Sequence, residues 1–217
     1  GADAGICLDG DADRLIMADE NGTIIDGDQI LGCLALAMQE KGTLFTNAVV
    51  GTVMSNRGLE TMLGRSDIDL HRVAVGDRYI LEKMRNDGLN LGGEPSGHIL
   101  MTDFARSGDG LLTALQMLTL LKGSTKKASS LFNSFRPNPQ RLKNLTGIDP
   151  IVLRRKPLQA AIREIEAGLG RRGRVLVRPS GTEPLIRVMV EAESEPLLSA
   201  TMDALILCIT DESDKNA

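Results

Sequence analysis

Three aspartates stand at alternate positions in the stretch ICLDGDADRL, residues 6–15. An apolar run leads into Asp9, Asp11 and Asp13, and Arg14 follows directly. Carboxylates this close repel one another unless a cation lies among them, and hard oxygen ligands suit Mg²⁺. We therefore expect Asp9, Asp11 and Asp13 to hold one Mg²⁺ ion and Arg14 to face the anion that the metal also binds.

Other interpretations of this stretch compete with a metal site. With Glu20, the aspartates fit EF-hand spacing, but Arg14 occupies the position that requires glycine and no helix leads in, so we reject it. An aspartyl-phosphate phosphotransferase, with Asp9 as nucleophile after the apolar strand, stays open although Asp13 replaces its usual Thr or Val. A plain polar turn of Asp and Gly also stays open.

A second polar stretch is GGEPSGH, residues 92–98. The carboxylate of Glu94 and the hydroxyl of Ser96 can grip neighbouring sugar hydroxyls, and His98 can exchange a proton near neutral pH. Glu94 and His98 replace the two glycines of a hydrolase nucleophile elbow, so we exclude that motif. A decorated turn is the simpler alternative. We interpret the other histidine, His71, as structural and without partners.

The third stretch is RPSGTEP, residues 178–184, between two predicted antiparallel strands. Arg178 offers a fork to an anion, Ser180 and Thr182 offer hydroxyls, and Gly181 lets backbone N–H groups turn inward. This predicts a phosphate site without Walker geometry, and a charged hairpin loop is the alternative. Arg187 lies on the following strand, and spacing fixes no role for it, nor for GTVMSN (51–56) and VGDRY (75–79).

The elements that must position these loops alternate between strand and helix, which is typical of α/β proteins. The expected strands are 4–8, 15–18, 23–25, 48–53, 70–75, 89–91, 98–101, 141–145, 174–177 and 185–191. The expected helices are 29–41, 55–63, 77–86, 107–122, 128–135, 158–167 and 195–210. A Ser-, Lys- and Pro-rich segment at 123–139 predicts a domain boundary, and residues 211–217 are expected to fray.

Composition excludes several classes of function. The 217 residues are 42% hydrophobic and 25% charged, which indicates a globular protein. A net charge of −4 with only 2% aromatic residues argues against nucleic acid as a partner. The longest apolar runs are far too short for a membrane span. Cys7, Cys33 and Cys208 form no close pair and each lies in an apolar stretch, which predicts buried, reduced thiols and a cytoplasmic location.

The metal, sugar and phosphate stretches, in this order, resemble the α-D-phosphohexomutases. In that family four domains surround one cleft, and the loops lie in domains two, three and four. The resemblance implies that residues 1–27 end a domain two, that 28–137 form a complete α/β domain three with a mixed sheet, and that 138–217 form a smaller α+β domain four. It covers essentially the whole chain, yet only the later half of a family member.

Five stretches of the sequence most resemble those of the bacterial branch of the family that interconverts glucosamine 6-phosphate and glucosamine 1-phosphate. They are DGDADR, GTVMSN, VGDRY, GGEPSGH and RPSGTEPLIRVMVE. The resemblance implies Mg²⁺ on Asp9, Asp11 and Asp13, with Arg14 orienting the phosphoryl group and His98 as acid or base. It further implies a sugar phosphate as substrate and a glucosamine 1,6-bisphosphate intermediate. Glu94 and Ser96 then bind sugar hydroxyls, and Arg178, Ser180, Gly181 and Thr182 grip the phosphate that is not transferred.

One departure from the family concerns the nucleophile. The family's phosphoserine lies in domain one, and none of this chain's serines has its sequence context. We therefore expect this chain to be inactive without the N-terminal half of the same protein. The alternatives are a phosphomannomutase/phosphoglucomutase of the same family and a sugar-phosphate-binding protein without catalysis.

Overall fold

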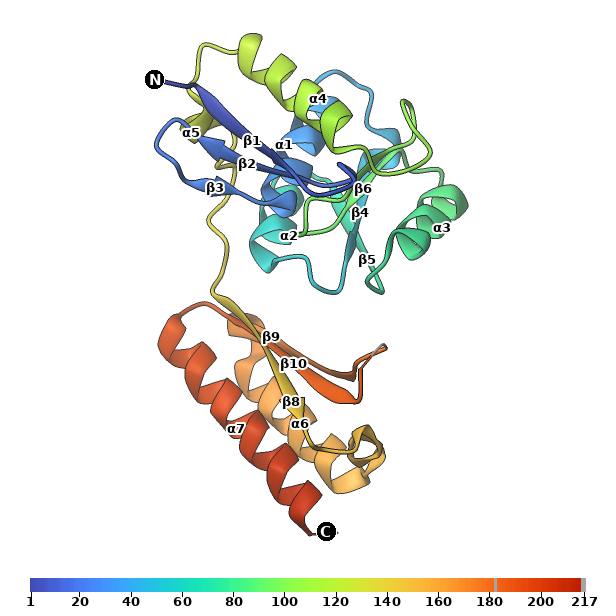
Figure 1. The fold of residues 1–217 in the computed structure, drawn as a ribbon, viewed down its shortest axis with the longest axis vertical. Coiled ribbons are helices and arrows are strands. Elements are labelled where there is room, and N and C mark those ends of the chain that lie inside the picture. Colours follow the sequence, from blue (N-terminus) through green and yellow to red (C-terminus); the bar gives the residue numbers. More distant parts are fainter. Residues whose placement is uncertain (182, 216–217) are drawn as a thin grey trace. The chain divides into compact units, whose positions relative to one another are not determined.

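The protein is described by a computed structural model that covers residues 1–181 and 183–215. It forms two compact units, Gly1–Pro137 and Asn138–Ala217 (Figure 1). The expected α/β class is confirmed. Residues 1–27 pack with 28–137 in the first unit, and their assignment to a separate preceding domain stays a prediction.

Two sheets make up the first unit. An antiparallel sheet has the order β1-β2-β3, with β1 at Ala4–Leu8, β2 at Leu15–Asp19 and β3 at Ile24–Ile25. The second sheet has the order β5-β4-β6-β7 and consists of β4 (Ala48–Thr52), β5 (Asp69–Val73), β6 (Leu91–Gly93) and β7 (Ile99–Met101). In it β4 runs parallel to β5 and β6, whereas β7 is antiparallel to β6, so the sheet is mixed as predicted.

The helices of this unit are α1 (Gly27–Glu40), α2 (Arg57–Gly64), α3 (Asp77–Asp87), α4 (Gly110–Lys122) and α5 (Ala128–Leu131), with a 3₁₀ turn, η1, at Phe45–Asn47. Helix α1 begins with a capping box in which Asp26 and Gln29 satisfy each other's backbone N–H groups. Helix α4 begins later than predicted because the Asp109 side chain caps it by accepting from Leu112 N.

One apolar core joins the two sheets of the first unit. Helix α1 packs against α2, α4 and β6, and its Ile30 and Leu31 are fully buried together with Leu15 of β2 and Leu59 of α2. Burial of a Leu or Ile side chain contributes roughly 1.5–3 kcal/mol, so this shared core holds the β1–β2 hairpin and the mixed sheet together as one body.

The second unit is an α+β layer structure (Figure 1). Its antiparallel sheet has the order β8-β10-β9, with β8 at Gln140–Thr146, β9 at Gly173–Pro179 and β10 at Leu185–Ala192. Its helices are α6 (Lys156–Leu169) and α7 (Glu195–Asp214), with 3₁₀ turns η2 (Pro150–Arg154) and η3 (Gly170–Arg172). Alternate residues of β10, beginning with Ile186, face these helices, and the residues between them face the other way.

The predicted fraying of 211–217 is wrong for its first residues, because α7 continues to Asp214. Arg155 anchors this last turn: its Nη1 donates to the Glu212 carbonyl at 2.7 Å and lies 3.6 Å from the Glu212 carboxylate. Residues 216–217 lie outside the described residues. Among the helices of the described residues, none has the length and apolar character needed to cross a membrane.

Candidate functional site

The aspartate stretch forms the tight loop of the β1–β2 hairpin, which the Leu8 and Leu15 pair closes. Asp9, Asp11 and Asp13 each offer one carboxylate oxygen, and these oxygens lie within 4.8 Å of one another. The loop turns on Ala12, whose φ of +58° is left-handed and whose N–H donates to Asp9 O at 3.2 Å. The hairpin thus gathers three hard oxygen donors at one point.

The donor set fits a small, hard cation. One carboxylate oxygen of Asp13, Oδ1, is buried and accepts no hydrogen bond within residues 1–181 and 183–215. Arg14 lies beside the triad: its Nε is 3.7 Å from Asp9 Oδ2 and 3.7 Å from Asp13 Oδ1. Three carboxylates leave further octahedral positions for water or a phosphate oxygen, as Mg²⁺ requires.

The GGEPSGH loop connects β6 to β7, and its centre is the Glu94 carboxylate. Gly76 N donates to Glu94 Oε1 at 3.0 Å, and the Ser96 hydroxyl lies 3.5 Å from Glu94 Oε2. The backbone of the VGDRY stretch therefore holds one oxygen of Glu94, while Ser96 is exposed beside the other. This leaves a carboxylate and a hydroxyl side by side at the surface, where sugar hydroxyls can reach them.

The aspartate loop and the sugar loop (92–98) pack directly on each other. Leu15 N donates to Gly97 O at 3.0 Å, and Gly27 N donates to Pro95 O at 3.1 Å. A Cβ on Gly97, whose φ is +91°, would lie 2.1 Å from Leu15 O, and a Cβ on Gly27 would lie 2.0 Å from Glu94 O. Only glycine fits at these two approaches, which bring the predicted metal and sugar residues into one site.

His98 links the two loops through its side chain. Its Nδ1 is 3.1 Å from Asp13 Oδ2, and the residue is only 7% exposed. Its ring packs so tightly on Gly108 that a Cβ there would lie 2.3 Å from Cε1. A histidine held this way orients a carboxylate, and that role suits His98 at least as well as the predicted acid or base role, which stays a prediction.

GTVMSN spans the carboxyl end of β4, and VGDRY follows the carboxyl end of β5, the parallel neighbour of β4 in the mixed sheet. The sugar loop follows the carboxyl end of β6, which is parallel to β4. Ligands bind at this edge in open α/β sheets. The residue spacing within GTVMSN and VGDRY did not indicate a role for either stretch. The sheet topology places both at the same edge of the mixed sheet as the sugar loop.

The sequence patterns assigned Asp28 to no site, and the structure gives the cap of α1 to its neighbour Asp26. Asp28 is 2% exposed, and its Oδ2 accepts from Asn56 N at 2.7 Å. Burial raises the pKa of Asp28 to about 7 and the Asp26 charge adds to this, against opposing hydrogen bonds from Asn56 N and Ser55 and the Arg72 charge. A carboxylate so perturbed at the edge of a site marks a functional candidate.

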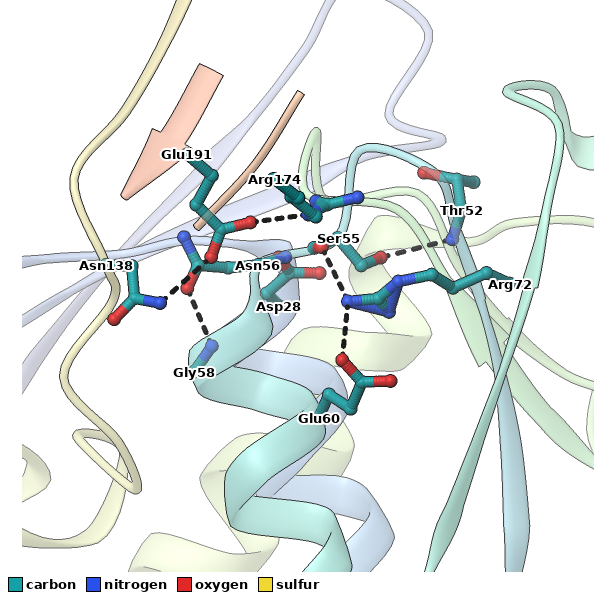
Figure 2. A network of polar contacts seen from close by, with 10 residues as sticks. All are labelled: Asp28, Thr52, Ser55, Asn56, Gly58, Glu60, Arg72, Asn138, Arg174 and Glu191. Carbon is teal, nitrogen blue, oxygen red and sulfur yellow. Dashed lines mark hydrogen bonds and ion pairs between the residues drawn. The ribbon is translucent and has the colours of Figure 1, made fainter. Parts of the chain in front are cut away.

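Polar contacts continue around Asp28 at the first turn of α2 (Figure 2). Arg72 of β5 donates from Nη2 to Ser55 O at 3.1 Å and to Glu60 Oε2 at 3.4 Å. The Ser55 hydroxyl accepts from Thr52 N at 3.1 Å. The GTVMSN loop is therefore fixed by its own backbone, by β5 and by Asp28.

His71 has partners, contrary to the prediction. Its Nδ1 lies 3.0 Å from Asp87 Oδ2, and Lys83 Nζ lies 2.7 Å from the same oxygen. The Lys83 hydrogen bond, with His71 helping, keeps the pKa of Asp87 below its ordinary value. These contacts join β5 to the end of α3, which fits a structural role.

The phosphate loop lies between β9 and β10 of the second unit. Arg178 and Arg187 are direct partners in the antiparallel register, on the sheet face that points away from α6 and α7. Ser180 Oγ and Arg187 Nε are buried atoms with no hydrogen bond to the described part of the chain. Like charges placed opposite each other destabilise a sheet, and the Glu183 carboxylate, 3.6 Å from Arg187 Nη2, offsets part of this charge. Thr182, also predicted here, lies outside the described residues.

Figure 2 also draws three residues of the second unit. The Glu191 carboxylate is fully buried and accepts from Arg174 Nε at 2.7 Å and from Asn138 Nδ2 at 3.2 Å. Buried charges are stable only when paired in this way. The contacts tie β9 and the start of the second unit to β10, on the sheet face that also carries Arg178 and Arg187.

Comparisons with known proteins agree with this layout. Residues 26–138 match the family model described as phosphoglucomutase/phosphomannomutase, alpha/beta/alpha domain III, and residues 138–207 match the C-terminal domain model of the same family. Phosphoglucosamine mutase of Chelativorans sp. (strain BNC1) is 50% identical over 210 residues, which are 97% of this chain and 47% of that protein. The enzyme of the same name from Parvibaculum lavamentivorans is 51% identical over 208 residues, 96% of this chain and 46% of that protein.

Solved structures show the same fold. An N-acetylglucosamine-phosphate mutase in its product complex has a TM-score of 0.78 at 20% identity, over 95% of this chain and 48% of that one. A Burkholderia thailandensis phosphoglucomutase/phosphomannomutase family protein has a TM-score of 0.79 at 23% identity, over 97% and 47%. The chain spans about half the length of the curated relatives it matches. Because the family models and the half-identical relatives cover nearly all of it, this chain belongs to the phosphoglucomutase/phosphomannomutase family, the family that its three loops predicted.

Proposed function

We propose that this chain carries the metal, sugar and phosphate loops of a phosphoglucosamine mutase, which interconverts glucosamine 6-phosphate and glucosamine 1-phosphate. The observation that supports this proposal most is that Asp9, Asp11 and Asp13 converge beside the sugar loop, in a chain that is about 50% identical to enzymes of that name. Since the chain spans about half of those relatives, the activity belongs to the whole protein and is part of the proposal.

The aspartate loop is the proposed Mg²⁺ site. Asp9, Asp11 and Asp13 would hold the ion, which when bound offsets charge on a phosphoryl group in transfer. Arg14 lies next to the same carboxylates and can turn its guanidinium to a phosphate oxygen. His98 holds the Asp13 carboxylate in place through Nδ1. A magnesium complex is described for the Aspergillus fumigatus N-acetylphosphoglucosamine mutase, a structural neighbour at 20% identity.

The sugar and phosphate loops position the substrate. Glu94, fixed by Gly76 N, accepts hydrogen bonds from sugar hydroxyls, and Ser96 donates or accepts beside it. Arg178, Ser180, Gly181 and Thr182 form the proposed grip on the phosphate that is not transferred. We add Arg187 to this grip, because it lies opposite Arg178 and its buried Nε has no hydrogen bond to the described part of the chain.

The phosphoryl carrier in this proposal is a phosphoserine outside these 217 residues. One serine–phosphate ester bond breaks as a sugar–phosphate bond forms, which gives glucosamine 1,6-bisphosphate. The bisphosphate then returns its other phosphoryl group to the serine. The chain alone is therefore expected to bind ligands without turnover. A cytoplasmic location is part of the proposal, and the three free cysteines support it. The predicted burial of these thiols is wrong for Cys7, which is exposed.

Two experiments test the proposed function. The first is calorimetric titration of the chain with Mg²⁺ and with glucosamine 6-phosphate. It compares the affinities of the variant Asp11→Asn with those of the control variant Asp3→Asn, because Asp3 lies outside the triad. The second mixes the chain with the preceding half of the Chelativorans enzyme and assays glucosamine 1-phosphate formation, with mannose 6-phosphate as the competing substrate. Activity only in the mixture, and lost with Asp11→Asn, supports the proposal. Equal activity of the wild-type and Asp11→Asn mixtures, or turnover of mannose 6-phosphate alone, refutes it.

A further inference from the structure

Asp28 is a buried carboxylate that the proposed reaction does not use. It stands at the second position of α1, where the capping box of Asp26 and Gln29 already satisfies the helix start. Its Oδ2 accepts from Asn56 N at 2.7 Å, and Asn56 is the residue that caps α2 through Gly58 N at 2.8 Å. Asp28 therefore connects the first turn of α1 to the end of the GTVMSN loop.

The same turn of α1 supports the sugar loop. Gly27, directly before Asp28, donates its N–H to Pro95 O at 3.1 Å. The two backbones approach so closely that a Cβ on Gly27 would lie 2.0 Å from Glu94 O and 2.5 Å from Gly97 N. Any shift of this turn must therefore displace Glu94 and Gly97 with it.

We propose that Asp28 is a positioning residue that fixes the sugar loop and the GTVMSN loop (51–56) relative to each other through the first turn of α1. Three features of the structure favour this role over a purely structural one. Asp26 already supplies the cap of α1, so Asp28 is not needed there. An ionised group in the core is also costly, and a neutral residue would pack at this position without that cost. Both connected loops also lie at the ligand-binding edge of the mixed sheet.

The charges around Asp28 are those of three elements. Asp26 is the N-cap of the same helix. Arg72 of β5 lies near Asp28, and Glu60 of α2 pairs with Arg72 (Figure 2). Ser55 and Asn56 contribute neutral donors from the loop. Burial outweighs these donors and raises the pKa of Asp28 to about 7, so its charge changes within a pH range that the chain can be studied in.

This inference rests on the proposed function, but its test measures directly whether Asp28 connects the two loops. Amide hydrogen exchange is measured on the 217-residue chain at Asn56, Gly27 and Gly97, from pH 6 to pH 8, after correction for intrinsic rates. Variants are Asp28→Ala, Asp28→Asn and the control Met117→Ala, which removes a buried side chain of α4 but none of these hydrogen bonds. A second measurement titrates glucosamine 6-phosphate into each variant.

Asp28→Ala is expected to speed exchange at all three amides by about tenfold, since each loses a hydrogen bond or its support. Asp28→Asn keeps an acceptor for Asn56 N, so it should rescue protection and remove the pH dependence of the wild type. Binding of glucosamine 6-phosphate should weaken in Asp28→Ala and recover in Asp28→Asn.

Two results would overturn the inference. One is faster exchange at Asn56 with no change at Gly27 and Gly97, which makes the contact local. The other is an equal response to Met117→Ala, which makes the effect general destabilisation. If Asp28→Ala does not fold, a wild-type profile that matches Asp28→Asn at every pH overturns it as well. A chain that binds no glucosamine 6-phosphate contradicts the proposed function, and the exchange data still decide the role of Asp28.

Discussion

The substitution Asp28→Asn should make the stability of the first unit less dependent on pH. Folding moves the Asp28 carboxyl from a pKa of 3.8 to about 7, chiefly through burial. The folded state then holds the proton more tightly than the unfolded state. The resulting stabilisation is complete below pH 3.8 and is lost as the pH rises to about 7, so the wild type becomes less stable across this window.

The magnitude follows from the size of the shift. About three pKa units at about 1.4 kcal/mol each give a total of about 4 kcal/mol. Part of it is lost below pH 5, which leaves about 2–3 kcal/mol between pH 5 and pH 8. The asparagine side chain of the variant cannot ionise in this range. The free energy of unfolding of Asp28→Asn should therefore rise relative to that of the wild type by this amount between the two pH values.

Urea unfolding at pH 5, 6, 7 and 8 measures the effect. The chain's single tyrosine, Tyr79, lies in α3, so its fluorescence reports the first unit. Asp69→Asn, an exposed carboxylate at the start of β5, is the matched control and should run parallel to the wild type. Burial also raises the pKa of Asp26, but that residue is present in all three proteins and its contribution largely cancels. Parallel curves for Asp28→Asn and the wild type would refute the reasoning.

Three further results are expected. Gly97→Ala should destabilise the first unit by about 3 kcal/mol in urea unfolding, because it combines a left-handed φ with a clash between the new Cβ and Leu15 O. The control Gly64→Ala, where a Cβ meets no atom within 4 Å, should change the stability by less than about 1 kcal/mol. Equal effects of the two variants would contradict the close approach of Gly97 to Leu15. His98→Ala should weaken Mg²⁺ binding by about tenfold in calorimetry, and unchanged affinity would remove its role on Asp13. Arg187→Gln should weaken binding of inorganic phosphate by about tenfold in calorimetry, because it removes the charge opposite Arg178, and unchanged affinity would remove Arg187 from the phosphate grip.

Local patterns in the sequence predicted most of the fold. The strands at 15–18 and 23–25, which pair as neighbours, and the alternating β10 run at 185–191 were each predicted from residues close together in the chain. The predicted end of α7 was wrong because its support comes from Arg155, 57 residues earlier than Glu212. Helix ends depend on such partners as much as on composition.

The same holds for the candidate site: features within one loop were predicted from sequence, and contacts between distant residues were not. The spacing of Asp9, Asp11 and Asp13 and of Glu94 and Ser96 placed each group on one tight loop, where short-range geometry decides. The bond from His98 to Asp13 joins residues far apart in the chain, and the sequence offers no local sign of it. The sheet order that brings GTVMSN and VGDRY beside the sugar loop is also a tertiary property.

The burial of Asp28 depends on a tertiary contact that its local sequence does not specify. Asp26 and Asp28 flank one glycine, and either could cap α1 as far as propensity goes. Once Gly27 is pressed against the sugar loop, the backbone before it has the extended conformation of a cap, so Asp26 takes that place. Asp28 is then forced inside the first turn and toward Asn56. A contact between backbones, which only glycine permits, thus decides which of two neighbouring carboxylates is almost fully buried and has its pKa raised to about 7.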